Sequence, residues 1–125
     1  MHLISPEKIF KGNGAWFKAL PQIKKFSKRP LILGRSGATN YIRHRIYEDL
    51  LEKKIEIHIA NLQFDCCYED LERVESIALK NNCDSIIAIG GGKVLDAGKF
   101  LADSLSVPVI TIPLSASTCA GWTAL

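Results

Sequence analysis

The run Gly90-Gly91-Gly92-Lys93 is the clearest candidate for chemistry in this sequence. Glycines let backbone N–H groups come close to a phosphate, and a helix that begins there adds partial positive charge. Lys93 adds a full positive charge. A tight turn that needs a positive φ is the alternative explanation, but one glycine would be enough for that. We therefore predict an anion-binding turn. It is neither a P-loop nor a GxGxxG turn, because positions 87, 94 and 95 are Ile, Val and Leu.

Asp96 and Lys99 follow on the helix that is predicted after this turn. Asp96 suits the positive end of the helix dipole, and it could also hold the loop or the ligand in place. Lys99 is explained as well by an i,i+3 pair with Asp96. Both interpretations stay open from the residues alone.

A loop of small residues spans Leu114 to Thr123. A loop of this kind can approach a cofactor closely and hydrogen-bond to it, but its composition fits a polar surface loop equally well. Its four hydroxyl side chains are those of Ser115, Ser117, Thr118 and Thr123.

Alternating strand and helix patterns must position these residues. Short apolar or alternating runs predict strands, and apolar residues repeated at three- and four-residue spacing predict helices. The helix near the N-terminus contains Pro21, which either opens it or kinks it. The predicted strands are 30–33, 55–59, 85–89 and 107–112, and the predicted helices are 16–26, 38–53, 68–81 and 93–104.

This order predicts an α/β fold, with a Rossmann-like parallel sheet and helices on both faces. Ligands of such sheets bind beyond the carboxyl ends of the strands. The turns at residues 34–36, 90–93 and 113–115 should therefore meet at one edge of the sheet. That convergence predicts a binding site.

Length and composition exclude several classes of protein. With 125 residues, 47% hydrophobic and 23% charged, the chain suits one soluble domain of residues 1–125. No apolar run approaches the ~18 residues of a membrane helix, and the first residues lack the pattern of a secretory signal. The cysteines Cys66, Cys67, Cys83 and Cys119 form no CxxC, so we expect free thiols in a cytoplasmic protein.

Charge is distributed unevenly along the chain. Residues 1–54 hold 12 Lys/Arg and 4 Asp/Glu, a net +8, whereas residues 55–125 hold 4 and 9, a net −5. A basic half suggests nucleic acid or a phosphorylated ligand. Because the basic run around Lys24 and Arg29 lacks interleaved aromatics beyond Phe26, we expect no nucleic-acid partner, and no membrane partner either.

Two long motifs carry a resemblance to a known family. Residues 90–99 resemble the GGGK-x-x-D-x-x-K motif of the glycerol dehydrogenase branch of the iron-containing alcohol dehydrogenase superfamily. Residues 107–113, followed by Ser115-Ala116-Ser117-Thr118, resemble that branch's strand, proline and A-S-T loop. The resemblance runs from about Ile9 to the last residue, with matching element order.

The resemblance implies that this chain is the N-terminal, NAD(P)-binding half of the dehydroquinate synthase-like fold. The family's C-terminal helical domain, which holds zinc or iron through one Asp and two His, is absent from this chain, and no metal ligand is expected here. His2, His44 and His58 match no metal position of the family. We expect the 125 residues alone to bind a dinucleotide weakly, without activity, and the full-length protein to be a homo-oligomer.

Site roles are carried over position by position. Gly91, Gly92 and Lys93 would hold the pyrophosphate, and Asp96 would brace their loop. The nicotinamide side would be lined by Ser117, Thr123 and Leu125, and we include Gly90, Ser115 and Thr118 among the cofactor contacts.

Departures from the family's pattern put glycerol itself in doubt. Cys119 stands where glycerol dehydrogenases have an Asp that contacts the polyol, so we name it as a substrate contact. Leu114 and Trp122 also depart, and residues 117–123 look more like the hydroxycarboxylate or 2-oxoacid subgroup. The implied function is a metal-dependent NAD(P) oxidoreductase for a small alcohol, polyol or 2-hydroxy acid. The alternatives are a non-catalytic, stand-alone nucleotide-binding module and an enzyme like dehydroquinate synthase or glycerol-1-phosphate dehydrogenase.

Cofactor preference depends on the end of the first predicted strand. The family has an acidic residue there that hydrogen-bonds the adenosine ribose, but this chain has Arg35 followed by Ser36. An arginine and a hydroxyl would receive a 2′-phosphate, which an Asp would repel. A solvated loop arginine is the alternative. We predict NADP(H) in preference to NAD(H).

Overall fold

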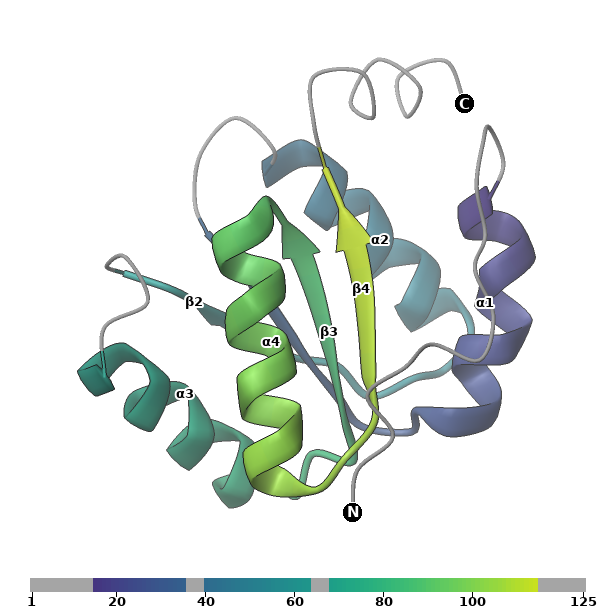
Figure 1. Ribbon diagram of the computed structural model, residues 1–125. Coiled ribbons are helices and arrows are strands. Elements are labelled where there is room, and N and C mark those ends of the chain that lie inside the picture. The colour runs from purple at the N-terminus through teal and green to yellow at the C-terminus, as the bar shows by residue number, and fades with distance from the viewer. Residues whose placement is uncertain (1–14, 36–39, 64–67, 115–125) are drawn as a thin grey trace.

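Four parallel strands form one sheet within residues 15–35, 40–63 and 68–114, the part of the chain that the computed structural model describes. Their order across the sheet is β2-β1-β3-β4 (Figure 1). Every residue of β1 and β3, the two central strands, is buried. The predicted parallel sheet is confirmed. The strands are β1 (Pro30–Gly34), β2 (His58–Asn61), β3 (Ser85–Gly90) and β4 (Val109–Pro113).

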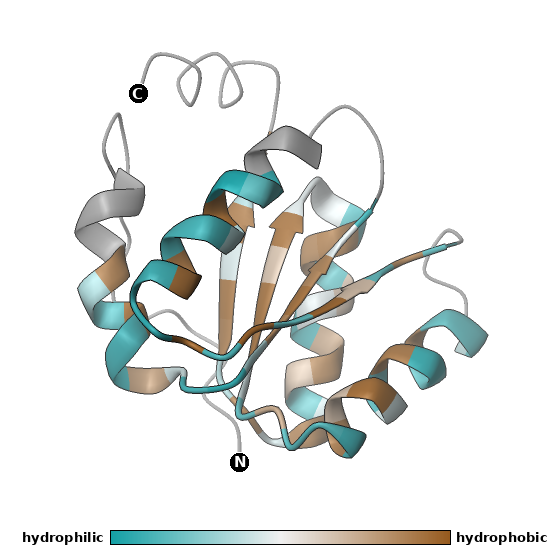
Figure 2. Cartoon of the chain, turned by 180° about the vertical axis from the view of Figure 1, so that it is seen from behind, coloured by the Kyte–Doolittle hydropathy of each residue, from teal (hydrophilic) through white to brown (hydrophobic). Residues whose placement is uncertain are grey.

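Helices cover both faces of the sheet, as predicted (Figures 1 and 2). On one face, α1 (Ala15–Phe26) and α2 (Asn40–Glu52) pack Leu20 and Leu50 against Ile32 and Ile87. On the other, α3 (Tyr68–Lys80) and α4 (Gly92–Leu105) form a second core with the opposite sides of β1 and β3. The apolar sides of the helices turn toward the sheet in Figure 2, as amphipathic helices should.

The N-terminal helix runs through its proline. Because α1 begins at Ala15 and Pro21 lies inside it, the suggestion that Pro21 opens this helix is wrong.

Three helices end in the same way, with a non-glycine residue in the left-handed conformation. The next residue then donates its N–H to the carbonyl five positions back, as in a Schellman motif. These bonds join Ile55 to Leu50, Cys83 to Ala78 and Val107 to Ala102, at 3.1, 3.0 and 3.0 Å. The left-handed residues are Lys54, Asn82 and Ser106, with φ of +62°, +54° and +57°.

This helix ending corrects the second predicted strand. The alternation of Ile55, Ile57 and Ile59 predicts a strand over 55–59, but β2 begins only at His58. Ile55 is buried because it closes the end of α2, a role that the alternating pattern does not distinguish from a strand residue. The fourth predicted strand also moves, by two residues at its start.

Candidate functional site

The carboxyl ends of the strands lie along one edge of the sheet, as predicted. Gly34 pairs in register with Asn61, and Gly90 with Pro113. Each glycine carbonyl accepts an N–H from just beyond the neighbouring strand: Leu62 donates to Gly34 at 2.8 Å and Leu114 to Gly90 at 2.9 Å. We call this edge the strand-end rim; its described members are Gly34, Arg35, Asn61, Gly90–Lys93 and Pro113.

The first glycine of the 90–92 run is required by the fold. Gly90 has φ of +153°, which L side chains rarely adopt. A Cβ placed there would lie 3.1 Å from Cβ of Val94, which begins the buried face of α4. One glycine therefore serves the turn.

The other two glycines meet no steric demand. Within the described residues, a Cβ at Gly91 or Gly92 would have no atom within 4 Å, apart from its chain neighbours and, for Gly92, the backbone of its own helix. Gly91 has φ −83° and ψ −174°, which any residue adopts. It is the N-cap of α4 and supplies no side-chain cap, so the first N–H groups of the helix are left for another acceptor. Open backbone at a helix N-terminus is the geometry that binds a phosphate.

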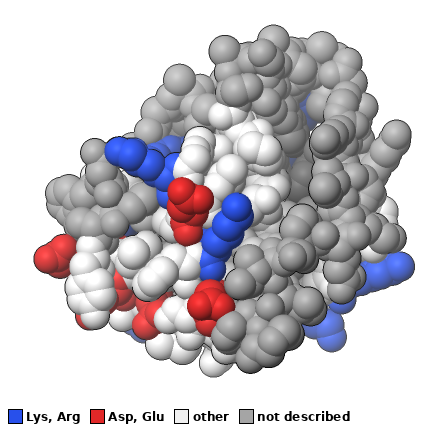
Figure 3. Space-filling model, in the orientation of Figure 1, with Lys and Arg blue, Asp and Glu red and all other residues white. Residues whose placement is uncertain are grey.

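The charged side chains of α4 lie on its exposed face. Lys93 is exposed in the first turn, beside the open glycines, and Asp96 and Lys99 are exposed further along. No ion pair joins Asp96 to Lys99 among the described side chains, so the i,i+3 interpretation of Lys99 is not supported. Figure 3 shows acidic and basic groups mixed on the face that carries α4, with no one-sign patch among the described residues.

Arg35 is the described part of the predicted cofactor-preference site. It follows Gly34 at the rim and is half-buried. The other candidates of the first β–α turn and of the last loop fall outside the described residues: Ser36, Ser115, Ser117, Thr118, Cys119, Thr123 and Leu125.

A buried arginine behind the rim was not predicted. Arg43 lies on the first turn of α2 and only 1% of it is exposed. Its side chain crosses Gly34 and hydrogen-bonds Tyr47, one turn further along. Burial raises the pKa of the Tyr47 phenol, although the charge of Arg43 and this hydrogen bond oppose the rise. The signal in the sequence is an arginine at the head of the buried series 43, 46, 47 and 50.

The end of β2 is fixed by another unpredicted group. The buried carboxylate of Asp70 accepts the Gln63 N–H at 2.9 Å and pairs with Arg73 at 2.6 Å. Arg73 also donates to the carbonyl oxygen of Asn61 at 2.6 Å. These bonds tie α3 to the rim.

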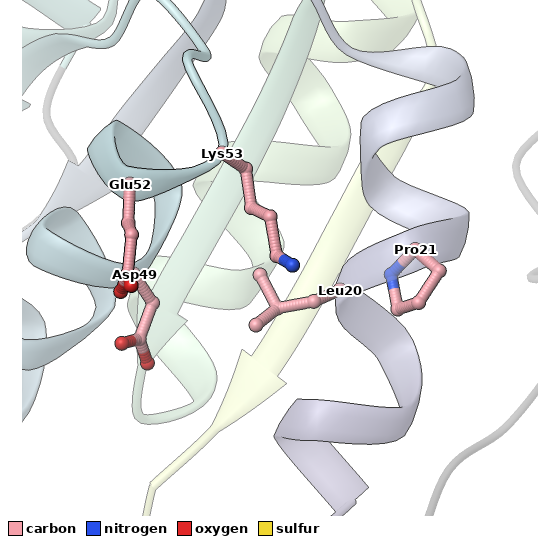
Figure 4. A pocket seen from close by; sticks show the side chains of 5 residues that line it. All are labelled: Leu20, Pro21, Asp49, Glu52 and Lys53. Carbon is pink, nitrogen blue, oxygen red and sulfur yellow. The ribbon is translucent and has the colours of Figure 1, made fainter.

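A hollow of about 220 Å³ between α1 and the end of α2 is not at the rim (Figure 4). Leu20 and Pro21 line it from α1, with Asp49, Glu52 and Lys53 on the other side. Its two carboxylates would repel a phosphate, and α2 points its C-terminal end there. This hollow is therefore less suited to a phosphate group than the strand-end rim is.

Other candidate chemistry is limited in the part of the chain that the structure describes. No three His, Cys, Asp or Glu side chains there are grouped to hold a metal ion. His58 pairs with Glu56 at 2.9 Å, and Cys83 is a free thiol whose pKa is raised by burial and by the charge of Asp84. None of the described helices combines the length and hydropathy needed to cross a bilayer.

A four-stranded parallel sheet with helices on both faces defines an α/β domain, and its carboxyl edge is where ligands of such sheets bind. Comparison with known proteins gives the family. Residues 6–125 match the iron-containing alcohol dehydrogenase family. The chain therefore belongs to the iron-containing alcohol dehydrogenases, in the glycerol dehydrogenase-like branch.

Individual relatives agree with this assignment. The chain is 31% identical to an uncharacterized oxidoreductase of Synechocystis sp. (90% of this chain, 29% of the relative). It is 30% identical to the glycerol dehydrogenase of Escherichia coli O6:H1 (97% and 33%). The glycerol dehydrogenase structure of Schizosaccharomyces pombe has the same fold, with a TM-score of 0.67 at 21% identity over 87% of this chain and 30% of that one. The chain thus spans about a third of the length of these relatives.

Proposed function

We propose that this chain is the cofactor-binding part of a metal-dependent NAD(P) oxidoreductase. Family membership supports the class of reaction. The observation that carries the binding role is the pair Gly91 and Gly92, which the fold does not require and which leave the N-terminus of α4 open.

In this proposal the pyrophosphate lies on the first N–H groups of α4. Lys93 contributes a charge-assisted contact, and Gly91 and Gly92 let the backbone approach the phosphates. When bound, the nicotinamide supplies hydride transfer to or from a substrate carbon. Residues 115–125 would contribute the nicotinamide contacts and, through Cys119, a substrate contact.

The metal and the substrate remain proposals about a longer protein. No set of metal ligands is grouped among the described residues, so we assign no metal role to them. We propose that zinc or iron is held by a helical domain outside these residues, in a cytoplasmic homo-oligomer. The proposed substrate is a small alcohol, polyol or 2-hydroxy acid.

A glycerol-1-phosphate dehydrogenase-like enzyme is the second candidate. The glycerol-1-phosphate dehydrogenase of Sulfolobus acidocaldarius is 32% identical to this chain, over 58% of the chain. Both candidates use the same cofactor site, so activity of the longer protein with glycerol, glycerol 1-phosphate and 2-hydroxy acids separates them.

Titration of the chain with NADPH and NADH tests the binding role. We expect weak binding of both, with the amide signals of residues 91–93 among those that shift most in NMR spectra. Binding that leaves these amides unchanged, or no binding at millimolar cofactor, would contradict the proposal.

Cofactor preference is tested by charge reversal at the end of β1. In the proposed complex, Arg35 faces the adenosine 2′-phosphate, so NADPH should bind more tightly than NADH. Arg35→Asp should reverse this order, and Arg45→Asp, on the half-exposed side of α2, should not. Equal affinities in the wild type, or an unchanged ratio in Arg35→Asp, would show that Arg35 is a solvated loop residue.

A further inference from the structure

The buried side of α2 contains an arginine where the other positions hold hydrophobic residues. Arg43, Ile46, Tyr47 and Leu50 occur at i, i+3, i+4 and i+7, and all four are at least nine-tenths buried. The first of them lies at the rim end of the helix, one turn from its N-terminus. Burying a charge is costly, so a leucine-like residue would be expected from packing alone.

Gly34 provides the space that Arg43 occupies. A Cβ at Gly34 would lie 2.6 Å from Cδ, 2.8 Å from Nε and 3.2 Å from Cζ of Arg43. The arginine therefore runs directly over the backbone at the end of β1. The next residue along the chain is Arg35, which faces the 2′-group in the proposed complex. The Gly34 carbonyl is held from the other side by the Leu62 N–H at 2.8 Å.

The electrostatic setting of Arg43 favours an anion at this corner of the rim. The side chain carries a buried positive charge within the first turn of α2, where the helix dipole is also positive. A charge in a low-dielectric interior acts over a longer distance than an exposed one. A phosphate group at the end of β1 would interact favourably with both, whereas a ribose hydroxyl would gain little.

We propose that Arg43 is a positioning residue for a 2′-phosphate subsite: it holds the Gly34–Arg35 backbone in place and supplies buried positive charge behind it. This inference rests on the proposed nucleotide-binding function, and it deepens that function by naming the group that is recognised. Arg43 does not touch the ligand, because it is buried; it acts by positioning Gly34 and Arg35 and by the field of its charge.

Two small nucleotides test the subsite in the chain itself. Adenosine 2′,5′-bisphosphate and 5′-AMP differ in the 2′-phosphate, so their affinity ratio in calorimetry reports this group alone. We expect the wild type to prefer the bisphosphate. Arg43→Met should lower the ratio about tenfold by removing the charge at similar volume. Arg43→Lys should lower it about threefold, because the charge remains but the planar donors are lost.

Arg45→Met, which removes a half-exposed charge from the same helix, is the matched control and should change the ratio less than twofold. A merely structural role for Arg43 would weaken both nucleotides in parallel and leave the ratio unchanged, which overturns the inference. If Arg43→Met does not fold, Arg43→Lys decides by the same criterion.

The wild type alone also tests the proposal. A wild type that binds both nucleotides equally overturns the inference. A wild type that binds neither shows instead that the nucleotide-binding proposal has failed, and this inference fails with it.

Discussion

Glycines in two regions of this molecule serve opposite purposes. Gly34 and Gly98 are crowded: a Cβ at Gly98 would lie 2.5 Å from Cβ of Ala88 on β3, and one at Gly34 would overlap Arg43. Gly91 and Gly92 face open space. The crowded glycines let a helix or a side chain approach the sheet. The open ones have no such role among the described residues, and our proposal explains their lack of side chains by the approach of a phosphate.

The largest effect that we expect is on dinucleotide binding, and it concerns Lys93, the residue that follows the open glycines. Lys93→Ala should weaken dinucleotide binding by about 1.5–3 kcal/mol if its contact with the pyrophosphate is charge-assisted. Calorimetric titration measures the loss, with Lys99→Ala, two turns further along α4, as the control. The circular dichroism spectrum should stay that of the wild type. A variant that loses it would show that Lys93 serves the turn and not the ligand.

Gly98→Ala should have the largest effect on stability. Overpacking typically costs 1–3 kcal/mol, and here the contact is with Cβ of the buried Ala88, which has no other rotamer to adopt, so we take about 3 kcal/mol. The better helix propensity of alanine returns about 1 kcal/mol. Urea denaturation should therefore show a net loss of about 2 kcal/mol. An unchanged midpoint would mean that α4 can move away from β3 at little cost.

Gly91→Ala and Gly92→Ala should show the reverse pattern. With open space around both positions, stability should change by no more than about 0.5 kcal/mol. Dinucleotide affinity should fall about fivefold, because a methyl group keeps the phosphates away from the first N–H groups of α4. Equal affinity in wild type and both variants would remove the main support for the phosphate site.

The sequence indicates that the glycine run at 90–92 is more than a turn, but it does not predict the crowding at Gly34. The run at 90–93 is local, and the argument that one glycine suffices for the turn is confirmed by Gly90, whose φ is positive. The contact between Gly34 and Arg43 joins a strand end to a helix nine residues later, and it depends on how α2 lies across the sheet. The apolar residues Ile42, Ile46 and Leu50 predict the helix, but an arginine beside them is expected to face solvent, so its place at the head of the series 43, 46, 47 and 50 becomes a signal only when the buried side of α2 is known.

Strand limits show the same division between local and tertiary causes. The continuous apolar runs of β1 and β3 are predicted almost to the residue, since strands buried on both faces leave little choice. The alternation of apolar residues at 55–59 fits a strand, but it fits equally well a helix that ends in a buried residue. Only the left-handed Lys54 decides between them, and lysine gives no signal for that conformation.

The smallest expected effect lies at a position where the backbone favours glycine and the sequence has none. Ser106 closes α4 with φ 57° and ψ 45°, and its N–H reaches the carbonyls of Ala102 and Asp103. A serine in this conformation carries a steric cost that glycine avoids, so Ser106→Gly should raise the free energy of unfolding by about 0.5–1 kcal/mol. Its exposed side chain has no cofactor role in our proposal, and nucleotide affinity should not change.

Asn82→Gly, at the same position of α3, is the control: asparagine tolerates the left-handed region, so the gain should be only about 0.3 kcal/mol. Urea midpoints of the two variants measure the difference. A loss of stability in Ser106→Gly would mean that the added freedom of the unfolded chain outweighs the relief of strain.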